Sequence, residues 1–108
     1  MNPAPVFRIN KFAVPTQSRG EFLDFIVETQ AVISAQPGFV RASMMEQYPG
    51  PGIFNFVALL EFSGPEAVDP IIAAIADYDR AQGIDRPAVM AGLGVKVDMG
   101  NYRALELT

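Results

Sequence analysis

Four stretches of the chain are rich in β-branched and aromatic residues, the composition typical of β-strands. They cover residues 6–14, 39–48, 54–62 and 95–105. The proline and glycine tetrapeptide at 49–52 favours a tight turn, so the second and third stretches are predicted to form an antiparallel hairpin. Gly100 interrupts the last stretch and predicts a β-bulge there.

Two other stretches repeat apolar residues every three or four positions, which is typical of a helix with one buried face. They cover residues 18–36 and 63–83. Ser18 and Ser63 each stand three residues before a glutamate, the spacing of a capping box at a helix start. Because proline is tolerated only in the first turn, Pro70 leaves open whether the second regular helix begins near Ser63 or, after a preliminary turn, near Asp69. A short additional helical turn is expected at 87–93.

The order of elements, β-α-β-β-α-β, predicts an α+β domain with its helices on one face of a four-stranded antiparallel sheet. A chain of 108 residues has room for one such domain. In the third strand, Phe56, Leu60 and Phe62 share one face, but Val57 and Leu59 on the other face are also apolar. A sheet face that meets water would carry polar residues there. The sequence therefore predicts a homodimer that buries the second face through sheet-to-sheet contact, and the alternative is a monomer with an apolar sheet.

The composition of the chain narrows the chemistry that it can perform. The absence of cysteine and histidine excludes thiolate and imidazole metal ligands and a cysteine nucleophile. The net charge is -4 and the eight basic residues are scattered, so no nucleic-acid binding is expected. No apolar run approaches the roughly 20 residues of a membrane span, and the first residues do not form a secretory signal. No membrane insertion and a cytoplasmic location are expected.

Four short motifs share their order and spacing with a known family. They are Asn10-Lys11-Phe12, Gln36-Pro37-Gly38-Phe39-Val40, Leu60-Glu61-Phe62-Ser63 and Asp98-Met99-Gly100-Asn101-Tyr102. Over about residues 6–105 the chain thereby resembles the antibiotic biosynthesis monooxygenase (ABM) domain family. The resemblance implies a ferredoxin-like subunit, a dimeric α+β barrel packed sheet to sheet, and a pocket between helices and sheet. Members of the family include cofactor-independent monooxygenases of polycyclic aromatic substrates, quinol monooxygenases and haem-degrading enzymes, and many members have no assigned activity.

Haem-degrading members of the family differ from this sequence at their functional positions. They use an asparagine in the first strand, a tryptophan at the end of the third strand and a histidine on the second helix. Only Asn10 matches here, because Phe62 occupies the tryptophan position and histidine is absent. No haem, no other cofactor and no metal is therefore expected.

The resemblance makes Asn10 the polar residue expected in the pocket, where its amide could polarise a substrate carbonyl or stabilise an oxyanion. Tyr78, at the edge of the apolar stripe of the second helix, is the other candidate catalytic residue, since its hydroxyl could reach a phenolic substrate. Ordinary structural roles are the alternative for both. The candidate substrate contacts are Arg8, Phe12, Met44, Phe56 and Phe62, although Arg8 could instead be a solvated or interface arginine.

Other charged residues offer weaker candidates. Glu46 and Glu61 lie on adjacent strands and would form an acid–base pair only if they shared a cleft. Asp77, Asp79 and Arg80 are interpreted as a solvated helix face. Two functions are consistent with these residues: a cofactor-independent monooxygenase of a small phenol, quinol or polyketide-like aromatic, and a non-catalytic dimer that binds a small apolar molecule.

Overall fold

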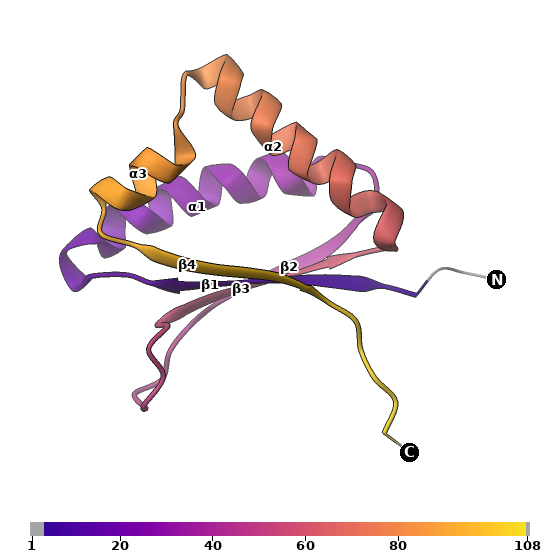
Figure 1. Cartoon of the computed structure of the whole chain (residues 1–108), viewed down its shortest axis with the longest axis horizontal. Helices are drawn as coiled ribbons and strands as arrows, with labels where there is room; N and C mark the ends of the chain where they lie inside the picture. The colour runs from indigo at the N-terminus through magenta and orange to yellow at the C-terminus, as the bar shows by residue number, and fades with distance from the viewer. Residues whose placement is uncertain (1–3, 108) are drawn as a thin grey trace.

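The computed structural model describes residues 4–107, which form four strands and three α-helices (Figure 1). The elements are, in chain order, β1 (Val6–Ala13), α1 (Arg19–Ser34), β2 (Phe39–Glu46), β3 (Phe56–Phe62), α2 (Val68–Gln82), α3 (Arg86–Gly92) and β4 (Lys96–Tyr102). The four predicted strands and both long helices are confirmed, and α3 is the short helical turn expected before the last strand.

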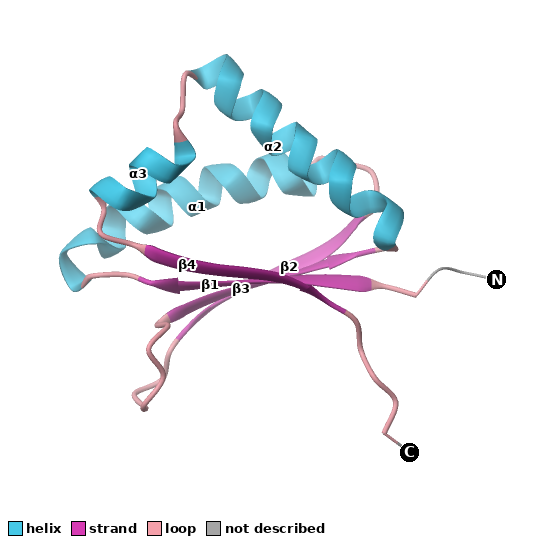
Figure 2. Cartoon of the chain, in the orientation of Figure 1, coloured by secondary structure: helices cyan, strands magenta, loops and turns pink. Residues whose placement is uncertain are grey.

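The strands form one antiparallel sheet in the order β2-β3-β1-β4, so β1 is a central strand. All three helices lie on one side of the sheet, and no described helix covers the other side (Figure 2). This is a ferredoxin-like α+β fold, as predicted. No helix in residues 4–107 is both long and apolar enough to cross a membrane. The cytoplasmic location stays a prediction.

The core between sheet and helices is divided into two clusters. The first surrounds Phe22 of α1, whose fully buried ring contacts those of Phe12 and Phe56 at centroid distances of 4.9 and 5.3 Å. The second joins Ile33, near the other end of α1, to Phe62 of β3 and to the first turn of α2. α1 is therefore packed against the sheet near both of its ends.

Both predicted capping boxes are wrong, because a 3₁₀ turn precedes each long helix. Before α1, the turn Thr16–Ser18 directs the Ser18 hydroxyl away from the helix, and it donates a hydrogen bond to the Leu93 carbonyl oxygen at 2.6 Å. Before α2, the turn Pro65–Ala67 is the preliminary turn, and the regular helix begins at Val68. The later of the two possible helix starts is thus the observed one.

The bulge predicted at Gly100 is also wrong. Gly100 pairs in regular register with Ile9 of β1, and β4 continues through it to Tyr102. The irregularity lies instead in β2, between Phe39 and Arg41, where the register against β3 shifts. The sheet therefore bends at an edge strand, and the pairing of β1 with β4 stays regular beside the helices.

Gly38 controls how closely the chain entering β2 approaches the start of α2. Its φ angle is +88°, and a Cβ atom there would lie 2.5 Å from the Cβ of Ala67. Gly20, within α1, has no such neighbour within 4 Å. We expect Gly38→Ala to lower the free energy of unfolding by about 1–3 kcal/mol, and Gly20→Ala to raise it by about 0.4–1 kcal/mol. Urea denaturation of both variants measures this, and equal stability of Gly38→Ala and wild type would contradict the prediction.

Candidate functional site

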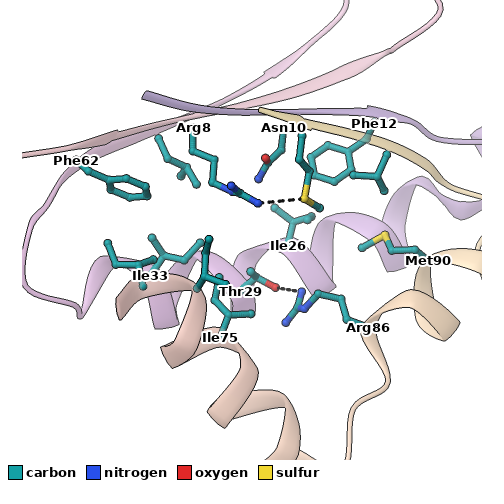
Figure 3. A pocket seen from close by; sticks show the side chains of 15 residues that line it. Arg8, Asn10, Phe12, Ile26, Thr29, Ile33, Phe62, Ile75, Arg86 and Met90 are labelled. Carbon is teal, nitrogen blue, oxygen red and sulfur yellow. Dashed lines mark hydrogen bonds between the residues drawn. The ribbon is translucent and has the colours of Figure 1, made fainter. Parts of the chain in front are cut away.

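A cavity of about 190 Å³ lies between the sheet and the three helices, and its wall includes members of both core clusters (Figure 3). Four polar side chains face it: Arg8 and Asn10 from β1, Thr29 from α1 and Arg86 from α3. The rest of the wall is apolar and consists of Phe12, Ile26, Ile33, Leu60, Phe62, Ile71, Ile72, Ile75, Met90, Val97 and Met99. An apolar wall with a few polar groups is the usual composition of a small-molecule site.

The alternation of side chains along β1 explains the position of the polar groups. Arg8, Asn10 and Phe12 are two residues apart, so all three face the helices. In the sheet, Asn10 stands between Ala58 of β3 and Met99 of β4. Because the alanine side chain is a single methyl group, it leaves space beside the amide.

The side chain of Asn10 extends from the sheet into the cavity (Figure 3). Its Oδ1 atom is buried and accepts no hydrogen bond from any residue in the described part of the chain. A buried acceptor without a donor destabilises the folded protein by about 1–3 kcal/mol. A ligand that donates a hydrogen bond to this oxygen would remove that penalty.

Arg8 points its guanidinium into the same cavity (Figure 3). It donates one hydrogen bond to Oδ1 of Asn101 at 3.1 Å and one to the sulfur of Met99 at 3.4 Å. Both acceptors are neutral, and within residues 4–107 no carboxylate forms an ion pair with Arg8. Arg8 therefore brings a positive charge to the cavity that no described side chain neutralises.

Arg86, on the helix side of the cavity, is held by a different set of contacts. Its Nε and Nη2 atoms donate to both carboxylate oxygens of Asp79 at 2.8 and 2.7 Å, and Nη1 donates to the Thr29 hydroxyl at 2.7 Å. Its guanidinium also lies 4.5 Å from the ring centroid of Phe25, a cation–π distance. This fork-to-fork pair joins α2 and α3 to α1 and neutralises the arginine.

Sequence reasoning missed Arg86, and it misplaced Asp79 on a solvated helix face. The Asp79 side chain is only 14% exposed, whereas Asp77 and Arg80 form an ion pair on the outer surface of α2 as expected. A signal for Arg86 was available: Asp85 caps α3 by accepting a hydrogen bond from the Ala88 amide, which fixes Arg86 in the first turn. The pairing with Asp79 depends on how α2 and α3 meet in space.

Four of the seven predicted site residues come together at the cavity: Arg8, Asn10, Phe12 and Phe62. The other three lie outside its wall.

Met44, Phe56 and Tyr78 lie outside the wall of this cavity, each for a separate reason. Met44 belongs to β2, which β3 separates from β1, and it packs against the first core cluster. Phe56 is buried within that same cluster. α2 rises away from the sheet toward its C-terminal end (Figure 1), so Ile75 still reaches the cavity but Tyr78, one turn later, does not.

The two glutamates considered as an acid–base pair do not share a cleft. Glu46 pairs with Arg19 at the start of α1, at 2.8 Å, and Glu61 pairs with Arg41 on the neighbouring strand, at 2.9 Å. The hydrogen bond from Arg19 holds the pKa of Glu46 below its ordinary value of 4.5. Among the described residues, no group of three carboxylates is placed to hold a metal ion.

Fold and cavity together define the class: a ferredoxin-like α+β domain with a mostly apolar pocket on its helix side. No protein-family model matches the chain, and no curated protein matches it significantly. Solved structures do match over nearly the whole length. One is a candidate monooxygenase from Shewanella loihica PV-4, with a TM-score of 0.72, 17% sequence identity and 98% of each chain covered.

Two further solved structures share the fold. SnoaB, a cofactor-independent oxygenase from Streptomyces nogalater, has a TM-score of 0.70 at 20% identity, with 95% of each chain covered. A dimeric ferredoxin-like protein from an uncultured marine organism has a TM-score of 0.68 at 16% identity, covering 96% of this chain and 99% of that one. These likenesses confirm the fold.

The Arg86–Asp79 pair should contribute more to stability than the exposed pair on the same helix. Asp79→Asn leaves a guanidinium that is mostly buried without its counter-charge, and we expect the free energy of unfolding to fall by about 1–3 kcal/mol. Asp77→Asn breaks the exposed pair with Arg80 and should change it by less than about 0.5 kcal/mol. Chemical denaturation of the two variants measures the difference. Equal effects would show that the buried pair does not fasten α2 to α3.

Proposed function

We propose that this protein is a cofactor-independent oxygenase that oxidises a small phenol or quinol in the cavity beside Asn10. The observation that carries the proposal is the buried, unpaired oxygen of Asn10 in a mostly apolar cavity. A phenolic hydroxyl can donate a hydrogen bond to that oxygen, and the NH₂ group of the same amide can donate to a carbonyl or oxyanion. The likeness to SnoaB and to the candidate monooxygenase supports the same class of reaction.

The reaction needs no electrons beyond those of the substrate. The phenol loses its proton to water, and a ring carbon of the resulting anion forms a bond to molecular oxygen. The peroxide takes back the proton that the phenol lost and then breaks its O–O bond: one oxygen remains on the carbon as a carbonyl, and the other leaves as hydroxide, which becomes water when it accepts the hydrogen of that carbon as a proton. Phenol and oxygen thus give quinone and water, with the substrate oxidised and oxygen reduced.

No described side chain of the cavity wall acts as a general base, and the positive charge of Arg8 instead favours ionisation of the phenol. No aspartate, glutamate or histidine lines its wall in the described part of the chain. A nearby guanidinium favours the ionised form of a phenol and lowers its pKa, so water can accept the proton near neutral pH. Arg8 faces the cavity (Figure 3) without a carboxylate partner among the described residues and supplies this effect, whereas Arg86, on the opposite side, is neutralised by Asp79.

The size of the cavity limits the substrate. A dry protein cavity of about 150 Å³ holds a benzene molecule, and this one measures about 190 Å³. Drug-sized ligands occupy pockets of roughly 300–1,000 Å³. We therefore propose substrates with one ring or two fused rings, and not the larger polycyclic aromatics.

Oxygen uptake with a panel of hydroquinones, naphthols and anthrone-like phenols tests the activity. We expect uptake with the smaller members and a loss of about 100-fold in kcat for Asn10→Ala, because an oxyanion partner is removed. Glu28→Gln, on the exposed side of α1, is the matched control and should retain full activity.

Two results would change the proposal. Equal turnover by Asn10→Ala would remove Asn10 from the mechanism. Binding of phenols without any oxygen uptake would favour the second candidate function, a non-catalytic binding protein, which the lack of a carboxylate or imidazole base in the cavity wall also supports.

We further propose that two copies pack through the sheet face that carries no helix. By strand alternation, this face presents apolar side chains from all four strands, namely Phe7, Ile9, Met45, Val57, Leu59 and Tyr102. The same alternation places the charged Lys11, Arg41, Glu61 and Asp98 on it. The β2–β3 hairpin and the chain after β4 project on the same side (Figure 1), and their tips expose Ile53 and Leu105 at 79% and 73%. A second copy would cover the apolar side chains of this face.

Size-exclusion chromatography with light scattering tests the dimer. We expect twice the 11.7 kDa mass of the chain. Leu59→Arg places a charge in the middle of the proposed interface and should give the monomer mass. Val27→Arg changes an apolar residue that is 67% exposed on α1 and should leave the dimer intact. A wild-type monomer at micromolar concentration would contradict the proposal.

A further inference from the structure

We infer that the cavity selects an organic anion, a hydroxylated aromatic carboxylate, and that Arg8 is the residue that binds its carboxylate. This inference rests on the proposed function, because it takes the cavity as the site that binds an aromatic substrate. It goes further by naming the charge of the ligand and the residue that binds the charged group.

The two arginines of the cavity differ in the partners that their guanidinium groups have within the protein. Arg86 has a carboxylate partner, a hydroxyl partner and an aromatic ring. Arg8 has only an amide oxygen and a thioether sulfur, the latter a weak acceptor. Since a guanidinium carries five N–H donors in a planar fork, Arg8 retains donors for a ligand.

Placing an unpaired charge against apolar walls is unfavourable unless something compensates it. The chain has twelve acidic residues and a net charge of -4, yet none of its described carboxylates lines this cavity. The cavity is therefore a positive site in a negatively charged protein. A bound carboxylate would provide the missing counter-charge, and its two oxygens match the guanidinium fork.

Asn10 adds a second requirement. It follows Arg8 by two positions on the same face of β1, so the two backbone positions are roughly 6.7 Å apart. The amide oxygen needs a donor, and a carboxylate cannot provide one. The ligand that satisfies both residues carries a carboxylate at one position of the ring and a hydroxyl at another, as 3- and 4-hydroxybenzoate do.

Isothermal titration calorimetry under nitrogen tests this inference without turnover. The probes are 4-hydroxybenzoate, its neutral analogue 4-hydroxybenzamide, and inorganic phosphate. We expect wild type to bind the carboxylate at least about 10-fold more tightly than the amide, and not to bind phosphate measurably. Arg8→Gln should weaken carboxylate binding by about 10- to 100-fold and change amide binding by less than about 3-fold.

Two more variants complete the design. Arg8→Lys keeps the charge but loses the planar fork, so its carboxylate affinity should lie between those of wild type and Arg8→Gln. Arg80→Gln removes an arginine that is 75% exposed on the outer side of α2 and should bind as wild type does. Circular dichroism shows whether Arg8→Gln folds. If it does not, the affinities of wild type and Arg8→Lys for 4-hydroxybenzoate and 4-hydroxybenzamide still test the inference.

Three results would overturn the inference: equal affinity of wild type for carboxylate and amide, an undiminished preference for the carboxylate in Arg8→Gln, or phosphate binding as tight as that of the carboxylate. Failure of the proposed function gives a different pattern. A carboxylate preference that depends on Arg8, without oxygen uptake, supports the anion site and contradicts the oxygenase. Oxygen uptake with neutral quinols, without preference for the carboxylate, supports the oxygenase and contradicts the anion site.

Discussion

The packing of α1 against the sheet at two separate points is the constraint on which the rest of the molecule depends. Phe22 anchors one end of the helix in the first cluster, and Ile33, eleven positions later, anchors the other end in the second cluster, which includes Phe62. Between these anchors, Ile26, which also packs against the first cluster, and Thr29 face the cavity. Because both ends are fixed, the middle of the helix cannot settle onto the sheet and close the space. The cavity is thus a consequence of how the core is divided.

The polar residues of β1 reinforce this division. A central strand beneath helices would ordinarily present only apolar side chains to them, and close packing would follow. Here Arg8 and Asn10 occupy two of those positions, and neither finds enough partners within the domain to be satisfied. By contrast, the arginine on the opposite wall is neutralised by Asp79 and serves to join α2, α3 and α1. One arginine is thus structural, and the other is free to interact with a ligand.

The sequence predicted the fold because its signals are local. Strand composition, helical periodicity and turn residues each depend on a few neighbouring positions, and strand alternation correctly placed Arg8, Asn10 and Phe12 on one face. The predictions that failed required spatial information. Ser18 has the spacing of a capping residue but bonds to Leu93 instead, 75 positions away. Tyr78 continues the apolar stripe of α2, yet the tilt of that helix takes it beyond the cavity. The role of Arg86 depends on the meeting of three helices, which no short motif encodes.

The chemistry of the site follows from what surrounds the reacting position more than from the fold. Ferredoxin-like domains at 16–20% identity share a backbone, and a shared backbone does not by itself determine the reaction. Among the described residues, none in the cavity wall is a carboxylate or imidazole base, but the wall has the guanidinium of Arg8 without a counter-charge and an unsatisfied amide oxygen. Such a wall cannot remove a proton from a weakly acidic C–H bond by itself. It can hold an anion that forms readily and keep it away from bulk water. A phenol is such a compound, because its acidity increases beside a positive charge and its anion carries electron density on ring carbon.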